Sequence, residues 1–383
     1  METHQQLFKI REALNRVSHD LQLSNDSPDS GSSAIKALLE LQKPSGSNIS
    51  ANPLPFSLSQ HLSQLADSVQ ELHNSKPSRN SIISFVTRRV WSHEVSRLAA
   101  EVESELQALI DRETVSKLAT TIAEMRNSSD SSPSLSLSLD EDKLLDEMCV
   151  LQERLSRGFD INLQHLLLKT GIFAELEWVL CNPIFSRRVR ERAAVSVKKV
   201  VLYNKDVFVG SVLVGGSVRV LVSMGSLCSL QVLSSLIKAI KSPLVDEMDS
   251  SGGILKIVSY LSSNEFEIKI MAMDCVMEIG YFGRKEAIEA MLNGGVIKKL
   301  VELQRSDLID KCARDVCEKG KEMKYPFASC VARFAVQLEV GEGLRQREKR
   351  ASKQLILNKV REACVSDAEC ATIVAEVLWG SSP

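Results

Sequence analysis

Two stretches of the chain, SGGILKIVSYL at residues 251–261 and NGGVIKKLVEL at residues 293–303, are versions of one pattern. Each begins with a pair of glycines and continues as an aliphatic helical run. Glycine suits the corner before such a helix, because it accepts a positive φ and has no side chain to collide with its neighbours. The same small-glycine-apolar signal recurs at Thr170-Gly171-Ile172 and at Gly215-Gly216-Ser217.

The four copies follow one another at nearly constant intervals. Measured at the second residue of each signal, which is Gly171, Gly216, Gly253 and Gly295, the spacings are 45, 37 and 42 residues. A second helical run follows each copy, at residues 189–201, 229–240, 266–279 and 308–320. A helical period of about 40 residues predicts a solenoid, in which each unit buries its apolar face only against its neighbours. We therefore interpret the four glycines as structural corner residues of the repeats.

The rest of the chain also reads as helical. Residues 1–126 carry four amphipathic runs, which must cover one another and predict an N-terminal helical bundle. Residues 127–139 form a Ser-rich linker, read as a solvated connector with a phosphorylatable hinge as the alternative. The repeats, about four in number, then occupy residues 140–335. Residues 336–383 are predicted to be capping helices anchored by Trp379, so the fold class is all-α, a bundle followed by an α-α superhelix.

The repeat pattern, two glycines before an aliphatic helix and then an Ala-rich helix, resembles armadillo repeats. Residues 251–261 and 293–303 are similar to repeats of plant armadillo proteins, including the U-box ubiquitin ligases, and the resemblance covers about residues 160–335. A U-box would lie between bundle and repeats with a Cys-Pro-Ile-type start and alternating strand patterns, and we find no place for one. The resemblance implies a plant protein that binds other proteins without ligase activity, with an adaptor role in ubiquitin-related signalling as one option.

The resemblance also implies where a partner would bind. In armadillo repeats the last helix of each unit lines a concave groove, and an Asn side chain there holds the backbone of an extended peptide, because an amide both donates and accepts. Aligning that pattern puts the Asn position at Lys199, Lys238, Glu278 and Glu318. None is Asn, which argues against a groove that reads nuclear import signals. Two lysines followed by two glutamates favour a partner of opposite charge polarity; the alternative is ordinary solvated helix charge.

Composition and motifs narrow the function further. The formal net charge is −2, so we expect no specific nucleic-acid partner. The chain has no nucleotide loop, metalloprotease or hydrolase motif, so we expect no enzyme activity, cofactor or metal site. Nine cysteines without a C-x-x-C pair are interpreted as buried reduced thiols.

The expected location follows from the absence of two signals. The N-terminus lacks an apolar secretory core and no run reaches the ~18 apolar residues of a membrane span, so we expect a soluble cytoplasmic protein, with the nucleus or the plasma-membrane surface as alternatives. The rival function is a peripheral membrane or small-GTPase-associated armadillo adaptor. In that reading Trp91, among Arg88, Arg89 and Arg97, supplies a membrane face on the N-terminal bundle. The basic run at 345–353 is interpreted as an exposed helix face, with lipid or RNA contact or a nuclear signal as alternatives.

Overall fold

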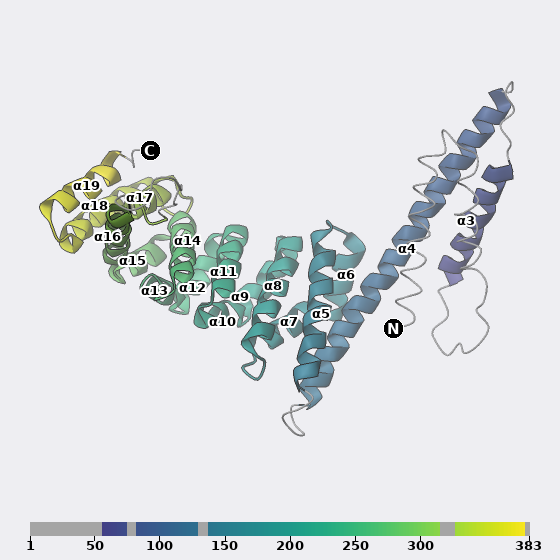
Figure 1. Cartoon of the computed structure of the whole chain (residues 1–383), viewed down its shortest axis with the longest axis horizontal. Helices are drawn as coiled ribbons and strands as arrows, with labels where there is room; N and C mark the ends of the chain where they lie inside the picture. The colour runs from purple at the N-terminus through teal and green to yellow at the C-terminus, as the bar shows by residue number, and fades with distance from the viewer. Residues whose placement is uncertain (1–55, 75–81, 129–136, 315–325, 380–383) are drawn as a thin grey trace. The chain divides into compact units, whose positions relative to one another are not determined.

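The computed structural model describes residues 56–74, 82–128, 137–314 and 326–379, and every regular element in these ranges is a helix (Figure 1). The fold class is therefore all-α, as predicted. The chain divides into two compact units, residues 1–117 with 161–166, and residues 118–160 with 167–383. The helices predicted at about 1–22 and 35–41 lie outside the described residues.

In the first unit a helical pair is described. Helix α3 (Phe56–Asn74) and the N-terminal part of α4 (Ile82–Ser128) bury aliphatic side chains at helical spacing, including Leu58 and Leu65 on α3 and Val95, Leu98, Val102 and Leu106 on α4. His61 Nδ1 of α3 lies 3.2 Å from Glu105 Oε1 of α4. The boundary between the two compact units falls inside α4, after Lys117, whereas the sequence suggested a bundle ending at residue 126.

The second unit is built mainly from a repeated triplet of helices, although residues 161–166, at the start of the first triplet, belong to the first unit. Two short helices precede each long one, and the order recurs three times: α6 (Ile161–Thr170), α7 (Ile172–Cys181) and α8 (Arg187–Tyr203); α9 (Lys205–Val214), α10 (Ser217–Met224) and α11 (Leu227–Ile240); α12 (Ser242–Ser250), α13 (Gly253–Tyr260) and α14 (Phe266–Phe282). The sequence pattern predicted the second and third helix of each triplet and missed the first as a separate element. Three helices per unit, with the long helix last, make this an armadillo-type solenoid.

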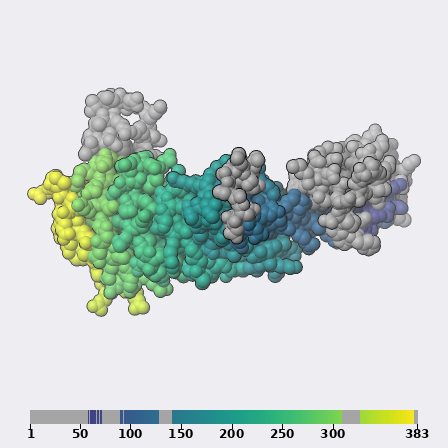
Figure 2. All heavy atoms as spheres, turned by 90° about the horizontal axis from the view of Figure 1, so that it is seen from below, coloured from purple at the N-terminus to yellow at the C-terminus, as the bar shows by residue number. Residues whose placement is uncertain are grey.

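Helix α5 and the last helix of each repeat form the continuous stack of the solenoid. Helix α5 (Leu137–Ser156) packs against α8, α8 against α11, α11 against α14, and α14 against α17 (Cys330–Val340). Figure 1 shows α8, α11 and α14 side by side in chain order, and Figure 2 shows the described residues of this unit as one closely packed body. We call α8, α11, α14 and α17 the third helices.

The fourth triplet departs from the prediction. It begins with α15 (Lys285–Asn293) and α16 (Val296–Arg314), but the helix that packs against α14 is α17. The sequence placed this last helix at residues 308–320, where α16 instead continues the preceding helix as far as Arg314. The repeat therefore extends to Val340, and the predicted end of the repeats at residue 335 falls inside α17.

The glycine corners serve two different purposes. Gly171, Gly252 and Gly295 have φ of 64°, 71° and 81°, a left-handed conformation that favours glycine because a Cβ strains it. In the third repeat the left-handed residue is thus Gly252, one position before the predicted Gly253. Gly216 has a φ of −87° and is not left-handed. There the pair makes room instead, because a Cβ on Gly215 would lie 2.0 Å from the Glu177 Oε1 that accepts from the Ser217 N–H.

Two helices cover the end of the stack. Helix α18 (Gln346–Ala363) packs against α16 and α17, and α19 (Asp367–Trp379) packs against α17 and α18. Ile373 and Val377 anchor α19, whereas Trp379, the predicted anchor, is 86% exposed. The basic run at 345–353 lies mostly on α18, where Lys349 Nζ donates to the Glu339 and Gly341 carbonyls.

Candidate binding face on the third helices

The third helices share one pattern of buried residues, which fixes their register. In α8 the pattern is Ala193, Ala194, Ser196, Val197 and Val200. The same spacing recurs as Leu233, Ser234, Leu236, Ile237 and Ile240 in α11, as Ala272, Met273, Cys275, Val276 and Ile279 in α14, and as Val331, Ala332, Phe334, Ala335 and Leu338 in α17. Helices with the same buried set present the remaining side chains in equivalent places.

The residue just before the last member of this shared pattern is half-buried in every third helix. These four rung positions are Lys199, Ala239, Glu278 and Gln337. Lys199 and Glu278 were predicted from sequence. The predicted Lys238 lies one residue before its rung, and the predicted Glu318 lies outside the described residues, its place in the stack being taken by Gln337. One rung therefore carries an amide, the group that both donates and accepts.

The predicted charged residues make contacts within the chain. Lys199 Nζ donates to Ser156 Oγ of α5 at 2.9 Å. Lys238 Nζ lies 3.3 Å from Glu278 Oε1, so these two predicted residues meet across neighbouring repeats. The lysine side chain is 59% exposed and the glutamate side chain 22%, so Lys238 is the more accessible partner of this pair.

A second row of positions lies one helical turn before the rungs. These preceding-turn positions are Val195, Ser235, Asp274 and Arg333, and all are half-buried or exposed. Burial raises the pKa of Asp274, while the charges of Lys238 and Arg333 act in the opposite direction. Rungs and preceding-turn positions together form what we call the third-helix face. It is basic on α8, neutral on α11, acidic on α14 and, through Arg333, basic again on α17.

Hydrogen bonds between neighbouring helices of the stack hold the spacing of this face. Gln152 Nε2 of α5 donates to Ser196 Oγ at 2.7 Å and to the Arg192 carbonyl at 3.2 Å. The thiol of Cys275 on α14 donates to the Leu230 carbonyl at 3.5 Å. Complete burial raises the pKa of the Cys275 thiol, which keeps it protonated and able to donate. The seven described cysteines are free, but only Cys275 and Cys330 are fully buried, so the sequence overestimated thiol burial.

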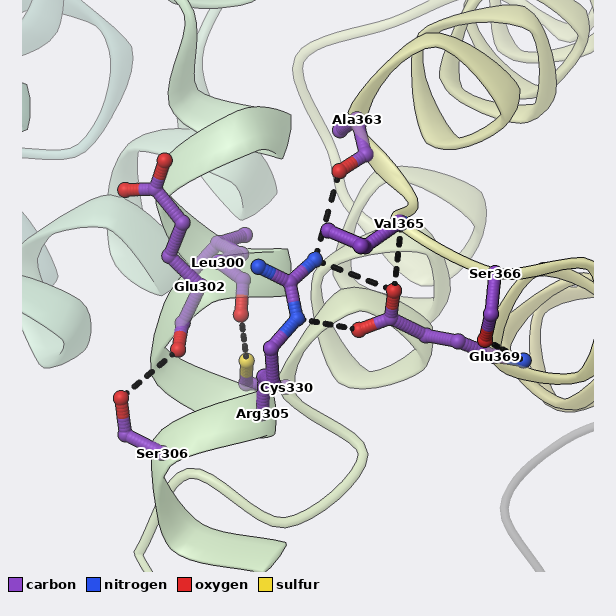
Figure 3. Close-up of polar contacts among 9 residues, drawn as sticks. All are labelled: Leu300, Glu302, Arg305, Ser306, Cys330, Ala363, Val365, Ser366 and Glu369. Carbon is purple, nitrogen blue, oxygen red and sulfur yellow. Dashed lines mark hydrogen bonds and ion pairs between the residues drawn. The ribbon is translucent and has the colours of Figure 1, made fainter. Parts of the chain in front are cut away.

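A polar cluster fastens the capping helices to the last repeat (Figure 3). Arg305 of α16 donates from Nε to Glu369 Oε1 at 2.7 Å and from Nη2 to Glu369 Oε2 at 3.0 Å and to the Ala363 carbonyl at 3.3 Å. The Val365 N–H also donates to Glu369 Oε2. The hydrogen bond from Arg305 lowers the pKa of Glu369. All these groups satisfy one another, so the cluster reads as structural.

Two other observations concern the rival functions. Within the described ranges, no group of three or more His, Cys, Asp and Glu side chains has a metal-binding arrangement. No one described helix has both the length and the apolar composition of a membrane span; α9 and α10 do so only taken together, with a 73° bend between them. Arg97, proposed for a membrane face, is paired with Glu94 and Glu101.

Among known proteins, the comparison found only solved structures with a similar fold. No family model and no curated protein matches the sequence. A designed armadillo repeat protein in complex with the peptide (KR)4 is 14% identical with a TM-score of 0.45, over 69% of this chain and 98% of that one. An engineered protein from a structural genomics consortium is 15% identical with a TM-score of 0.46, over 70% and 95%. Because these values are low, the likeness carries no argument about function, and the three-helix repeat itself identifies the fold.

Proposed function

We propose that this protein is a non-catalytic interaction scaffold whose third-helix face binds an extended segment of a partner protein. The observation that carries the proposal is the contrast between buried and half-buried positions on the third helices. The buried set is almost entirely small or aliphatic in every repeat, which preserves the stack. The rungs change from Lys to Ala to Glu to Gln, so the same scaffold offers a different contact at each step.

Peptide selection tests this proposal. Peptides are selected from a random 12-residue display library against the full chain, and their affinities are measured for the native chain and for Ala239→Trp, which fills the middle of the face. The control is Lys256→Trp, on an exposed position of α13. We expect Ala239→Trp to weaken binding by about tenfold or more, roughly 1.4 kcal/mol, and Lys256→Trp to leave it unchanged. Equal binding by both variants would refute the assignment of the face.

The finer reading of function is also a proposal. The similarity of residues 251–261 and 293–303 to repeats of plant armadillo proteins supports an adaptor in ubiquitin-related signalling, located in the cytoplasm of a plant cell and lacking a U-box. We expect the purified chain to give no ubiquitin chains when mixed with ubiquitin, an activating enzyme and a panel of conjugating enzymes. Formation of such chains would contradict the non-catalytic reading.

A further inference from the structure

We propose that the third-helix face selects a partner segment of split charge, with acidic residues over α8 and a basic residue over α14, about five to six residues apart. The inference rests on the proposed function and goes further, because it specifies the chemistry of the segment.

The basic end consists of the rung Lys199 and of Arg192, which lies about one turn beyond the third-helix face on the same side of α8. Arg192 and Lys199 are seven residues apart, which is about two helical turns, so they project from the same face. Arg192 Nη1 lies 3.4 Å from Gln152 Oε1, and Lys199 Nζ lies 2.9 Å from Ser156 Oγ. Both contacts are to neutral oxygens, and within the described part of the chain neither cation forms an ion pair. Acidic groups of a partner can therefore bind here without displacing a carboxylate.

The acidic end consists of Asp274 and Glu278, one turn apart on α14. Their neighbour Lys238 forms an ion pair with Glu278, and a pair whose lysine is this exposed contributes little to stability. A basic side chain of a partner can replace Lys238 at little cost and reach Asp274 as well. We infer that Lys238 competes with the partner for this end of the face.

The distance between the two ends sets the length of the segment. Helix α11 separates them and carries the small neutral Ser235 and Ala239 on the same face. Packed helices are about 8–10 Å apart, so two steps span about 16–20 Å. An extended chain rises about 3.3 Å per residue, which gives about five to six residues. A uniformly acidic segment would be repelled by α14 and a uniformly basic one by α8, so neither fits the whole face.

The test uses fluorescein-labelled synthetic peptides and the full chain in an anisotropy titration at low salt. The probe has two aspartates and two arginines separated by five Gly and Ser residues, and the comparison peptide has the same composition with alternating charges. We expect the split-charge probe to bind at least about fivefold more tightly. Replacing both cations, Arg192→Glu with Lys199→Glu, should abolish this preference and increase binding of an all-basic peptide. Lys238→Met should tighten binding of the probe about two- to fivefold.

The matched control carries the same change of charge on other helices. Lys256→Glu with Lys298→Glu alters exposed residues of α13 and α16 and should leave the preference intact. An equal loss in the control, or equal binding of split and alternating peptides by the native chain, would overturn the inference. If library-selected peptides still lose binding in Ala239→Trp, only the inference fails; if they do not, the proposed function fails as well.

Discussion

At the residue scale, three corner glycines have positive φ angles, which disfavour any residue with a Cβ. Gly252 has a φ of 71°, and a methyl group added there would have open space, since nothing lies within 4 Å of its Cβ position. Any penalty of Gly252→Ala therefore comes from the backbone. We expect a loss of about 1 kcal/mol in the free energy of unfolding, measured by urea titration.

Gly210 provides the matched control for this prediction. It lies inside α9, also has nothing within 4 Å, and has no positive φ. Gly210→Ala should stabilise the chain by up to about 1 kcal/mol, because alanine is the better helix former. Equal effects of the two substitutions would show that backbone conformation does not distinguish these positions.

Two details at single residues could not be predicted from the sequence alone. The Gly-Gly signal marks each corner, but it leaves open which glycine of a pair takes the positive φ, because that depends on where the preceding helix ends. The prediction of Lys238 misses its rung by one residue for a similar reason. Leu236, Ile237 and Ile240 fit more than one helical alignment, and only their burial fixes which of Lys238 and Ala239 is the rung.

At the scale of elements, the link between α16 and α19 should respond to pH. The pKa of Glu369 is lowered by its hydrogen bond with Arg305, so its stabilisation is present above the unfolded pKa of about 4.3 and is lost as pH falls through the folded value. Glu369→Gln should cost about 1–2 kcal/mol at pH 7, measured by urea unfolding, and the difference from the native chain should shrink below about pH 4. The exposed Glu362→Gln is the control; a pH-independent difference for Glu369→Gln would contradict the ion-pair account.

The fourth repeat is the element that sequence predicted least well. Residues 308–320 have helical periodicity and follow the glycine corner at the expected distance, so the pattern predicts the third helix there. The true third helix, α17, follows the first helical run of its repeat at a longer distance than in the other repeats. Its small residues Ala332 and Ala335 match Ala193 and Ala194 in kind, but contact with α14 is what identifies it.

At the scale of the whole molecule, a solenoid needs covered ends. Ile373 and Val377 of α19 are buried, so Ile373→Asp with Val377→Asp should detach this helix, because burying two unpaired carboxylates is far too costly. We expect binding of a hydrophobic dye and concentration-dependent association in size-exclusion chromatography. Ala371→Asp with Leu378→Asp adds the same charges at exposed positions of α19 and should leave the chain monodisperse to the same degree as the native protein.

The sequence predicted the architecture well because the same pattern, a glycine corner followed by an aliphatic helix, occurs in several copies. Four glycine corners and their aliphatic helices agree with one another, so an error in one copy does not change the fold. The third-helix face is different, since its rungs share no residue type. Their equivalence follows from the buried pattern of each helix. The sequence also does not reveal whether a charged residue forms an ion pair within the chain, as Lys238 does with Glu278.

The triplet α9–α10–α11 contributes a rung with no charge and only a methyl group, Ala239. Because each triplet packs mainly on the ones before and after it, this unit acts as a spacer whose copy number can change by whole units. Duplicating residues 205–241 would insert one more neutral step of about 8–10 Å, and the preferred separation of charges in the partner would lengthen by about three residues. The number of such triplets would therefore set the separation of charges in the partner segment that the face prefers.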